Sequence, residues 1–178
     1  RVTEMKQMVK GLHKNNIRVI MDVVYNHVYN AANHSFNKTV PGYYFRYDDN
    51  GSLVNNSGCG NDTASERAMM RKYIVDSVTY WAKNYNIDGF RFDLMGLIDT
   101  ETMKEVRSAL DKIDPSIIVL GEGWDMNSTM DKSEMTIQPN AYQVASDGTN
   151  NGIAFFNDSI RDGLKGSVFS DTDTGFVS

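Results

Sequence analysis

Three short apolar runs, each preceded by an amphipathic stretch, constrain the fold of this chain most strongly. The runs cover 17–24, 87–93 and 117–122, and helical periodicity precedes them over 2–15, 66–85 and 101–113. Near-continuous runs of this kind are typical of strands buried on both faces of a parallel sheet. Because the runs alternate with helices, the sequence predicts an α/β fold with a parallel sheet and right-handed crossovers.

The remaining segments complete this pattern. A fourth, shorter strand is expected at 153–157, followed by a helix over 158–165 that ends at Gly166. Residues 28–65 are rich in Asn, Gly, Ser and Tyr and are expected to form a long loop. Four aromatic residues argue against disorder in this loop, namely Tyr43, Tyr44, Phe45 and Tyr47.

Local signals also predict where two helices end or begin. Asn15 and Asn16 are expected to end the first helix, because Asn tolerates the left-handed backbone conformation. Thr100 is expected to cap the helix over 101–113 through its hydroxyl.

Composition and charge exclude several classes of function. Lys and Arg number 18 against 23 Asp and Glu, and the net charge of −5 argues against a nucleic-acid binder or a polybasic membrane surface. No apolar run approaches the roughly 18 residues of a membrane span. The single cysteine, Cys59, excludes an internal disulfide framework and a Cys-based zinc site. The chain starts without Met or a signal segment, so we expect an excerpt of a longer protein, and its localisation stays open.

Unusual polar groups follow three of the predicted strands. They lie in 22–27, 91–93 and 121–124. Because the carboxyl ends of parallel strands meet at one edge of the sheet, Asp93 and Glu122 are expected to lie side by side. Two carboxyl groups facing across a cleft are what glycoside cleavage requires, one of them ionised and the other protonated.

The neighbours of these carboxylates fit that division of roles. Arg91 lies two residues before Asp93, so it faces the same side of the strand and would hold Asp93 in its ionised form. Glu122 lies between two glycines and beside Trp124, and an apolar, poorly hydrated site would keep it protonated. The Asp93 and Glu122 carboxyl groups are expected about 5–5.5 Å apart, as retention requires, rather than the roughly 6.5–9.5 Å of an inverting pair.

Each residue also has a simpler interpretation. Asp93 alone could cap the following helix, and Glu122 alone could be a structural ion-pair partner of Arg91. His27 alone fits a hydrogen-bonded residue of the core or rim, and Asp22 fits an internal polar network. Their occurrence in order at three successive strand ends is what favours a catalytic site.

The motifs themselves resemble a known family. Asp22-Val-Val-Tyr-Asn-His27, Gly89-Phe-Arg-Phe-Asp93 and Gly121-Glu-Gly-Trp124 resemble three ordered signature regions of the α-amylase superfamily of glycoside hydrolases. Further segments are similar to the type I pullulanases, which are α-1,6 debranching enzymes: Ser57-Gly-Cys-Gly-Asn-Asp-Thr-Ala-Ser-Glu66, Phe92-Asp-Leu-Met-Gly96 and Phe155-Phe-Asn-Asp-Ser-Ile-Arg-Asp162. The resemblance covers essentially the whole chain.

This resemblance implies an incomplete (β/α)8 TIM-barrel catalytic domain. Residues 1–178 would form the central part of the barrel, from the helix after strand 2 to the helix after strand 6. The remaining strands and any flanking carbohydrate-binding domains would lie outside this chain. The family's fourth region, with its His-Asp pair near the seventh strand, has no counterpart here.

The resemblance also implies an activity and roles for single residues. The activity is retaining, double-displacement hydrolysis of α-1,6 glucosidic linkages in pullulan, amylopectin or limit dextrins. Asp93 matches the nucleophile, Glu122 the general acid/base, and Arg91 the arginine that orients and ionises the nucleophile. His27 matches a sugar-binding histidine, and Asp22 matches a buried aspartate that supports this region.

Four more residues are implied at the substrate cleft, namely Tyr25, Leu94, Met95 and Trp124, with Trp124 favoured for sugar contact. No cofactor or metal is assigned. Asn26 matches a calcium-ligand position in amylases, but pullulanases often lack that site, so calcium is left open. The expected partner is an α-glucan, without nucleic acid or membrane insertion.

Three alternatives stay open at this point. One is an α-1,4-acting or branching enzyme of the same superfamily. Another is a magnesium-dependent barrel lyase, which needs several metal-binding carboxylates and a Lys or His base, whereas Arg91 and His27 occupy those places here. The third is a catalytically incomplete fragment that only binds α-glucan.

Overall fold

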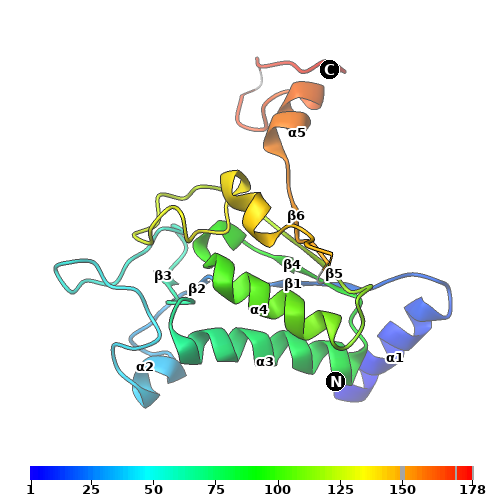
Figure 1. Ribbon diagram of the computed structural model, residues 1–178, viewed down its shortest axis with the longest axis horizontal. Coiled ribbons are helices and arrows are strands. Elements are labelled where there is room, and N and C mark those ends of the chain that lie inside the picture. The colour runs from blue at the N-terminus through cyan, green and yellow to red at the C-terminus, as the bar shows by residue number, and fades with distance from the viewer. Residues whose placement is uncertain (149–150, 171, 178) are drawn as a thin grey trace.

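Four parallel strands form the central sheet of the computed structural model, which describes residues 1–148, 151–170 and 172–177. Their order is β1–β4–β5–β6 (Figure 1). The strands are β1 (Ile20–Val23), β4 (Gly89–Phe92), β5 (Ile118–Gly121) and β6 (Ala154–Phe155). The predicted parallel α/β sheet is confirmed. With β1 and β6 at its edges, the sheet is open.

Helices cover one face of this sheet (Figure 1). They are α3 (Ala68–Tyr85) and α4 (Thr100–Asp111), and α1 (Val2–His13) packs beside α3. The apolar side chains between helices and sheet are buried and form one core, which includes Ile74, Val78, Phe90, Phe92, Met103, Val106 and Val119. Apolar burial on this face is the main stabilising contribution to the fold.

The second face of the sheet has a different character. Side chains alternate along a strand, so Arg91 points away from its buried neighbours Phe90 and Phe92. On β1, the Asp22 side chain is 67% exposed, and Ile20 is exposed as well. The prediction that 17–24 is buried on both faces is therefore wrong, because the helices of this chain cover one face only.

The long segment 28–65 contains more structure than predicted. It contains the short helix α2 (Ser35–Thr39). At its two ends, β2 (His27–Val28) and β3 (Asn61–Asp62) pair as an antiparallel two-stranded ribbon. Phe36 stacks on Tyr44 at a centroid distance of 4.7 Å and meets Tyr73 of α3 edge-on at 4.8 Å. The aromatic residues thus hold the segment against α3, which confirms the prediction that it is ordered.

The ends of α1 and α4 lie within two residues of the positions predicted from the sequence. Asn16 adopts the left-handed conformation as predicted, with φ of 58°, and α1 ends at His13. The cap of α4 is Asp99 rather than Thr100, because the Asp99 carboxylate accepts the backbone N–H of Thr102 at 2.9 Å. A carboxylate at a helix N-terminus is also favoured by the helix dipole.

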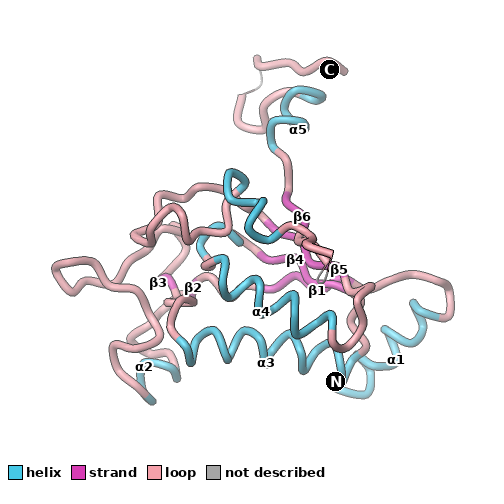
Figure 2. The backbone as a smooth tube through the Cα atoms, viewed as in Figure 1, coloured by secondary structure: helices cyan, strands magenta, loops and turns pink. Residues whose placement is uncertain are grey.

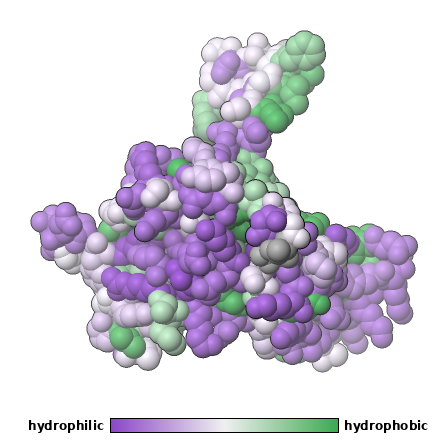
Figure 3. Space-filling model, in the orientation of Figure 1, coloured by the Kyte–Doolittle hydropathy of each residue, from purple (hydrophilic) through white to green (hydrophobic). Residues whose placement is uncertain are grey.

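The C-terminal part extends from β6 away from the sheet (Figures 1 and 2). It contains α5 (Asp158–Lys165), which ends at Gly166 as predicted, with φ of 90° there. Figure 3 shows apolar side chains gathered on this projection, where Ile160, Leu164, Phe169 and Phe176 are exposed. Among the helices of the described residues, none is long and apolar enough to cross a bilayer.

Candidate active site

Arg91 joins three carboxylates at the carboxyl edge of the sheet. Its Nη1 donates to Asp22 Oδ1 at 2.9 Å and to Asp93 Oδ1 at 3.1 Å. Its Nη2 lies 2.7 Å from Glu122 Oε1. The sheet register explains this convergence, because Asp22 pairs with Arg91 across β1 and β4, and Asp93 and Glu122 directly follow β4 and β5. Asp93 and Glu122 therefore lie on one edge, as predicted.

The surroundings of Arg91 favour its charged form. Partial burial works against the charge, but the hydrogen bond to Asp22, the charge of Glu122 and the hydrogen bond to Asp93 outweigh burial and raise the pKa of Arg91. Its guanidinium also lies 5.6 Å from the ring centre of Phe156, just after β6. A fixed cation thus stands between the two central carboxylates.

Asp93 is held at both carboxylate oxygens. Oδ1 accepts from Arg91, and Oδ2 accepts from Asn26 Nδ2 at 3.1 Å. Its backbone N–H donates to the carbonyl of Val23 at 3.0 Å, which extends the pairing of β1 and β4 beyond their ends. The side chain remains 27% exposed, so it is oriented by the protein and still reachable from solvent.

Glu122 has a charged environment rather than the predicted apolar one. Besides Arg91, it accepts the backbone N–H of Leu94 at Oε2, at 3.1 Å. Leu94 itself has φ of 38°, a left-handed conformation that costs a non-glycine residue about 1–2 kcal/mol. Glu122 therefore does form the ion pair with Arg91 that the simpler interpretation predicts.

His27 lies beside this cluster at the start of β2 and is half-buried. Its Nδ1 lies 2.6 Å from Asn26 Oδ1. Asn26, which is fully buried, is not among the residues predicted for catalysis or substrate binding. The sequence does hold a signal for it, because Asn26 follows Asp22 by four positions and alternation along an extended chain gives both residues the same side.

Two residues predicted to line the cleft are core residues instead. Tyr25 is buried, its hydroxyl bonds to Ser77 Oγ at 2.8 Å, and burial is the main reason that its pKa is raised. Tyr25 lies two positions after the buried Val23, so its side chain points to the same side, toward the helices. Met95 is fully buried, and its side chain packs against Gly121. The left-handed turn at Leu94 breaks the strand alternation and carries Met95 into the core.

Other predicted residues lie at the expected edge. Asp22 contacts Arg91 as expected of a supporting residue, but it is exposed rather than buried, because its face of the sheet is open. Trp124 is half-buried and lines a cavity of about 560 Å³ together with Glu122, Met126 and Phe169. Leu94 is half-buried beside Asp93 and Glu122.

The short helix η1 (Met95–Leu97) packs against the segment after β5 too closely for any side chain at Gly96. A Cβ there would lie 2.0 Å from the carbonyl oxygen of Trp124. We expect Gly96→Ala to lower the free energy of unfolding by about 2–4 kcal/mol, measured by urea denaturation. Gly11→Ala in α1 is the matched control, where nothing lies within 4 Å, and should raise it by up to about 1 kcal/mol. Equal stabilities for both variants would contradict this packing.

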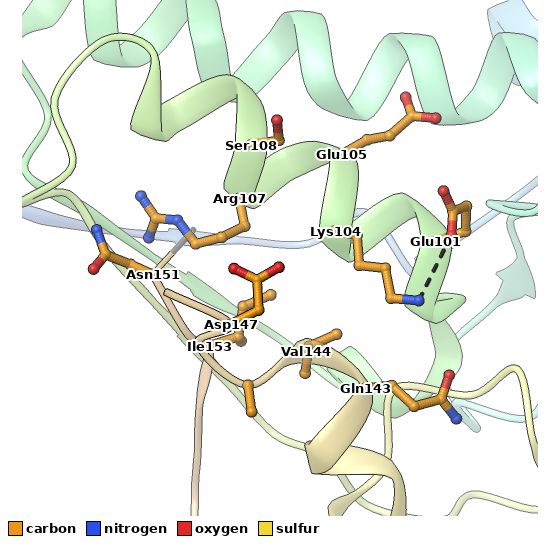
Figure 4. Close-up of a pocket in the computed structure, with 11 residues that line it drawn as sticks. Glu101, Lys104, Glu105, Arg107, Ser108, Gln143, Val144, Asp147, Asn151 and Ile153 are labelled. Atoms are coloured by element: carbon orange, nitrogen blue, oxygen red, sulfur yellow. Dashed lines mark ion pairs between the residues drawn. The ribbon is translucent and has the colours of Figure 1, made fainter. Parts of the chain in front are cut away.

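A second hollow lies on the helix side and is lined by α4, by residues of 143–147 and by Asn151 and Ile153 (Figure 4). Within the described part of the chain, it shares no lining residue with the cavity beside Glu122. Its charges have both signs, and Lys104 pairs with Glu101 at 3.7 Å. Among the described residues, no group of three or more His, Cys, Asp or Glu side chains is arranged to hold a metal ion.

Known proteins with similar sequences and structures include pullulanases. No family model matches the chain. It is 47% identical over 177 residues to the pullulanase of Bacillus subtilis (strain 168), covering 99% of this chain and 24% of that protein. The pullulanase of Paenibacillus barengoltzii, solved with maltohexaose and α-cyclodextrin, has a TM-score of 0.94 at 48% identity, covering 99% of this chain and 26% of that one. The pullulanase of Anoxybacillus sp. LM18-11, solved with maltotriose, has a TM-score of 0.93 at 50% identity, covering 99% and 24%.

The class of protein follows from fold and site together. The chain is an α/β protein whose acidic and basic side chains gather at the carboxyl edge of a parallel sheet, where such folds place their functional groups. Within that class it is homologous to a segment of the pullulanases, as its motifs predicted. It spans about a quarter of the length of the relatives it matches.

Proposed function

We propose that this chain is the central part of a pullulanase-type catalytic barrel that cleaves α-1,6 glucosidic linkages in pullulan, amylopectin or limit dextrins. The observation that carries the proposal is the guanidinium of Arg91 between Asp93 and Glu122, at 3.1 and 2.7 Å, in a segment 47% identical to a pullulanase. The solved relatives with bound maltotriose and maltohexaose support an α-glucan as the ligand.

The proposed reaction has two steps on these carboxylates. In the first, Asp93 attacks the anomeric carbon while Glu122 protonates the glycosidic oxygen, so the bond to the leaving glucan breaks and a covalent glycosyl-enzyme forms. In the second, Glu122 takes a proton from water, the water attacks the same carbon, and Asp93 is released. Retention of configuration is the expected outcome.

The contact between Arg91 and Glu122 means that Glu122 must move before it can act as the acid. The first step needs a proton donated by Glu122 at the glycosidic oxygen, whereas in this structure Glu122 Oε1 lies 2.7 Å from Arg91 Nη2. In the productive complex, Glu122 therefore turns from Arg91 toward the glycosidic oxygen, and Arg91 keeps its contacts with Asp93 and Asp22. Leu94 N–H supports Glu122 once it is ionised for the second step.

The open face of the sheet supports the barrel proposal. Parallel sheets are normally covered on both faces, yet here Asp22 and Ile20 are exposed on the face opposite the helices. A whole barrel takes about 250 residues, and this chain has 178. We propose that residues 1–178 run from the helix after strand 2 to the helix after strand 6, and that further strands close the barrel over this face.

Sugar contacts follow from the same edge. Trp124 lines the cavity beside Glu122, and an aromatic ring of this kind stacks on the apolar face of a glucose unit. His27 contributes the Nε2 side of its ring, because Nδ1 contacts Asn26. Leu94 lies between Asp93, which it follows in the chain, and Glu122, to which its backbone N–H donates.

Linkage specificity tests this proposal. The chain is assayed alone and as a chimera, in which it replaces the matching 177-residue segment of the Bacillus subtilis pullulanase. We expect the chimera to release reducing ends from pullulan and at least about tenfold fewer from linear amylose, a difference of about 1.4 kcal/mol in transition-state binding.

Three results would contradict parts of the proposal. Release from amylose without release from pullulan would identify an α-1,4-acting enzyme. Branch transfer without net hydrolysis would identify a branching enzyme. A folded chimera that binds maltotriose but cleaves neither polymer would identify a glucan-binding segment.

A further inference from the structure

Asn26 connects two groups of the site through a single side chain. It follows β1 by three residues and is fully buried. Its backbone carbonyl accepts the N–H of Thr63 at 3.0 Å, which fixes it to the segment after β3. Its side chain lies between Asp93 on one side and His27 on the other.

The orientation of the Asn26 amide follows from its partners. One end of the amide lies 2.6 Å from the backbone carbonyl oxygen of Asp93 and 3.1 Å from Asp93 Oδ2. Both of these atoms are acceptors, so this end is the NH₂ group. The amide oxygen therefore faces His27 Nδ1 at 2.6 Å, and His27 must donate from Nδ1. Neutral His27 then carries its proton on Nδ1 and has an unprotonated Nε2.

We propose that Asn26 is a positioning residue that fixes both the carboxylate of Asp93 and the tautomer of His27. The inference rests on the proposed function for its kinetic consequences. Arg91 holds Asp93 Oδ1 and Asn26 holds Oδ2, so the carboxylate cannot rotate without losing a hydrogen bond. The same amide directs Nε2 of His27 to accept a hydrogen bond from a sugar hydroxyl.

Charged groups are linked by contacts to both partners of this amide, Asp93 and His27. Arg91 and Asp93 come from β4 and its end, Asp22 from β1, and Glu122 from the end of β5. His27 and Asp62 come from the ribbon, where they pair across β2 and β3. Asp62 is itself occupied, because its two oxygens accept from the backbone and side-chain nitrogens of Asn56. Asn26 is the neutral group between Asp93 and His27.

The kinetic test exchanges the amide for a carboxylate of the same shape. Asn26→Asp is made in whichever form, the chain or the chimera, hydrolyses pullulan. A second carboxylate beside Asp93 disfavours ionised Asp93, so the acidic limb of kcat/KM against pH should move up by about one unit. We also expect kcat/KM at the optimum to fall about a hundredfold. Asn61→Asp is the matched control, because Asn61 bonds to the backbone of Ala31 and touches none of the site carboxylates.

A merely structural role predicts a different result. In that case Asn26→Asp would lower activity with the pH profile unmoved, or Asn61→Asp would move it equally, and either outcome overturns the proposal. An acidic limb that moves only in Asn26→Asp supports it.

A second measurement is independent of activity and of whether the variant folds. Nitrogen NMR of the unaltered chain, labelled in its histidine rings, reports which ring nitrogen of neutral His27 carries the proton. We expect Nδ1–H for His27, and a proton on Nε2 would overturn the proposal. If neither form hydrolyses pullulan, the proposed function fails, and this tautomer measurement alone decides the role of Asn26.

Discussion

Asp93→Asn is expected to lower kcat on pullulan by at least about a thousandfold. An amide is not a nucleophile at an anomeric carbon, so the glycosyl-enzyme cannot form. The substitution keeps the shape of the side chain, and its amide oxygen still accepts from Arg91 Nη1. Reducing-end release from pullulan measures the effect, and near-unchanged thermal unfolding shows that the fold is kept.

The control for Asp93→Asn removes a carboxylate elsewhere. Asp76 on α3 is 63% exposed and pairs with Lys72 at 2.6 Å, so Asp76→Asn should keep full activity. Residual pullulan hydrolysis above a few per cent in Asp93→Asn would mean that another group is the nucleophile.

Glu122→Gln is expected to lower kcat on pullulan by about a hundredfold to ten-thousandfold, since the leaving glucan oxygen then departs without a proton. A maltotriosyl fluoride does not depend on that proton in the same way, because fluoride is a much better leaving group than a sugar alkoxide. Glu122→Gln should therefore retain the first step on the fluoride, measured as released fluoride ion, while Asp93→Asn loses it.

Glu105→Gln on α4 serves as the control for Glu122→Gln. Glu105 is 50% exposed and pairs with Arg71 at 3.5 Å, away from the strand ends, and its loss should leave both rates unchanged. Equal losses on pullulan and on the fluoride in Glu122→Gln would argue that Glu122 is a structural partner of Arg91 and not the acid.

The sheet and its helices could be predicted because their signals are local. Apolar runs with helices between them predict parallel pairing, and the structure has it. The ribbon of β2 and β3 could not be predicted, because each of its strands has only two residues and shows no periodicity. The exposed face of β1 was also missed, since burial depends on what packs against a strand and not on the strand alone.

The central site could be predicted as far as strand geometry extends. Arg91, Asp93 and Glu122 converge because parallel strands end at one edge. Beyond the strand ends, side-chain directions depend on single backbone angles such as the left-handed Leu94, and Met95 is buried for that reason. The family resemblance places Tyr25 in the cleft. Tyr25 lies two positions after the buried Val23, however, and alternation along the chain points its side chain toward the helices.

The most direct test of the central claim is to capture the glycosyl-enzyme. The Glu122→Gln chimera is mixed with α-maltotriosyl fluoride and digested, and its peptides are weighed by mass spectrometry. A retaining mechanism on Asp93 predicts one maltotriosyl unit on the peptide that contains Asp93, and none when Asp93 is also replaced by asparagine. Fluoride release without any adduct on that peptide, or an adduct on another residue, would contradict a retaining mechanism centred on Asp93 and Glu122.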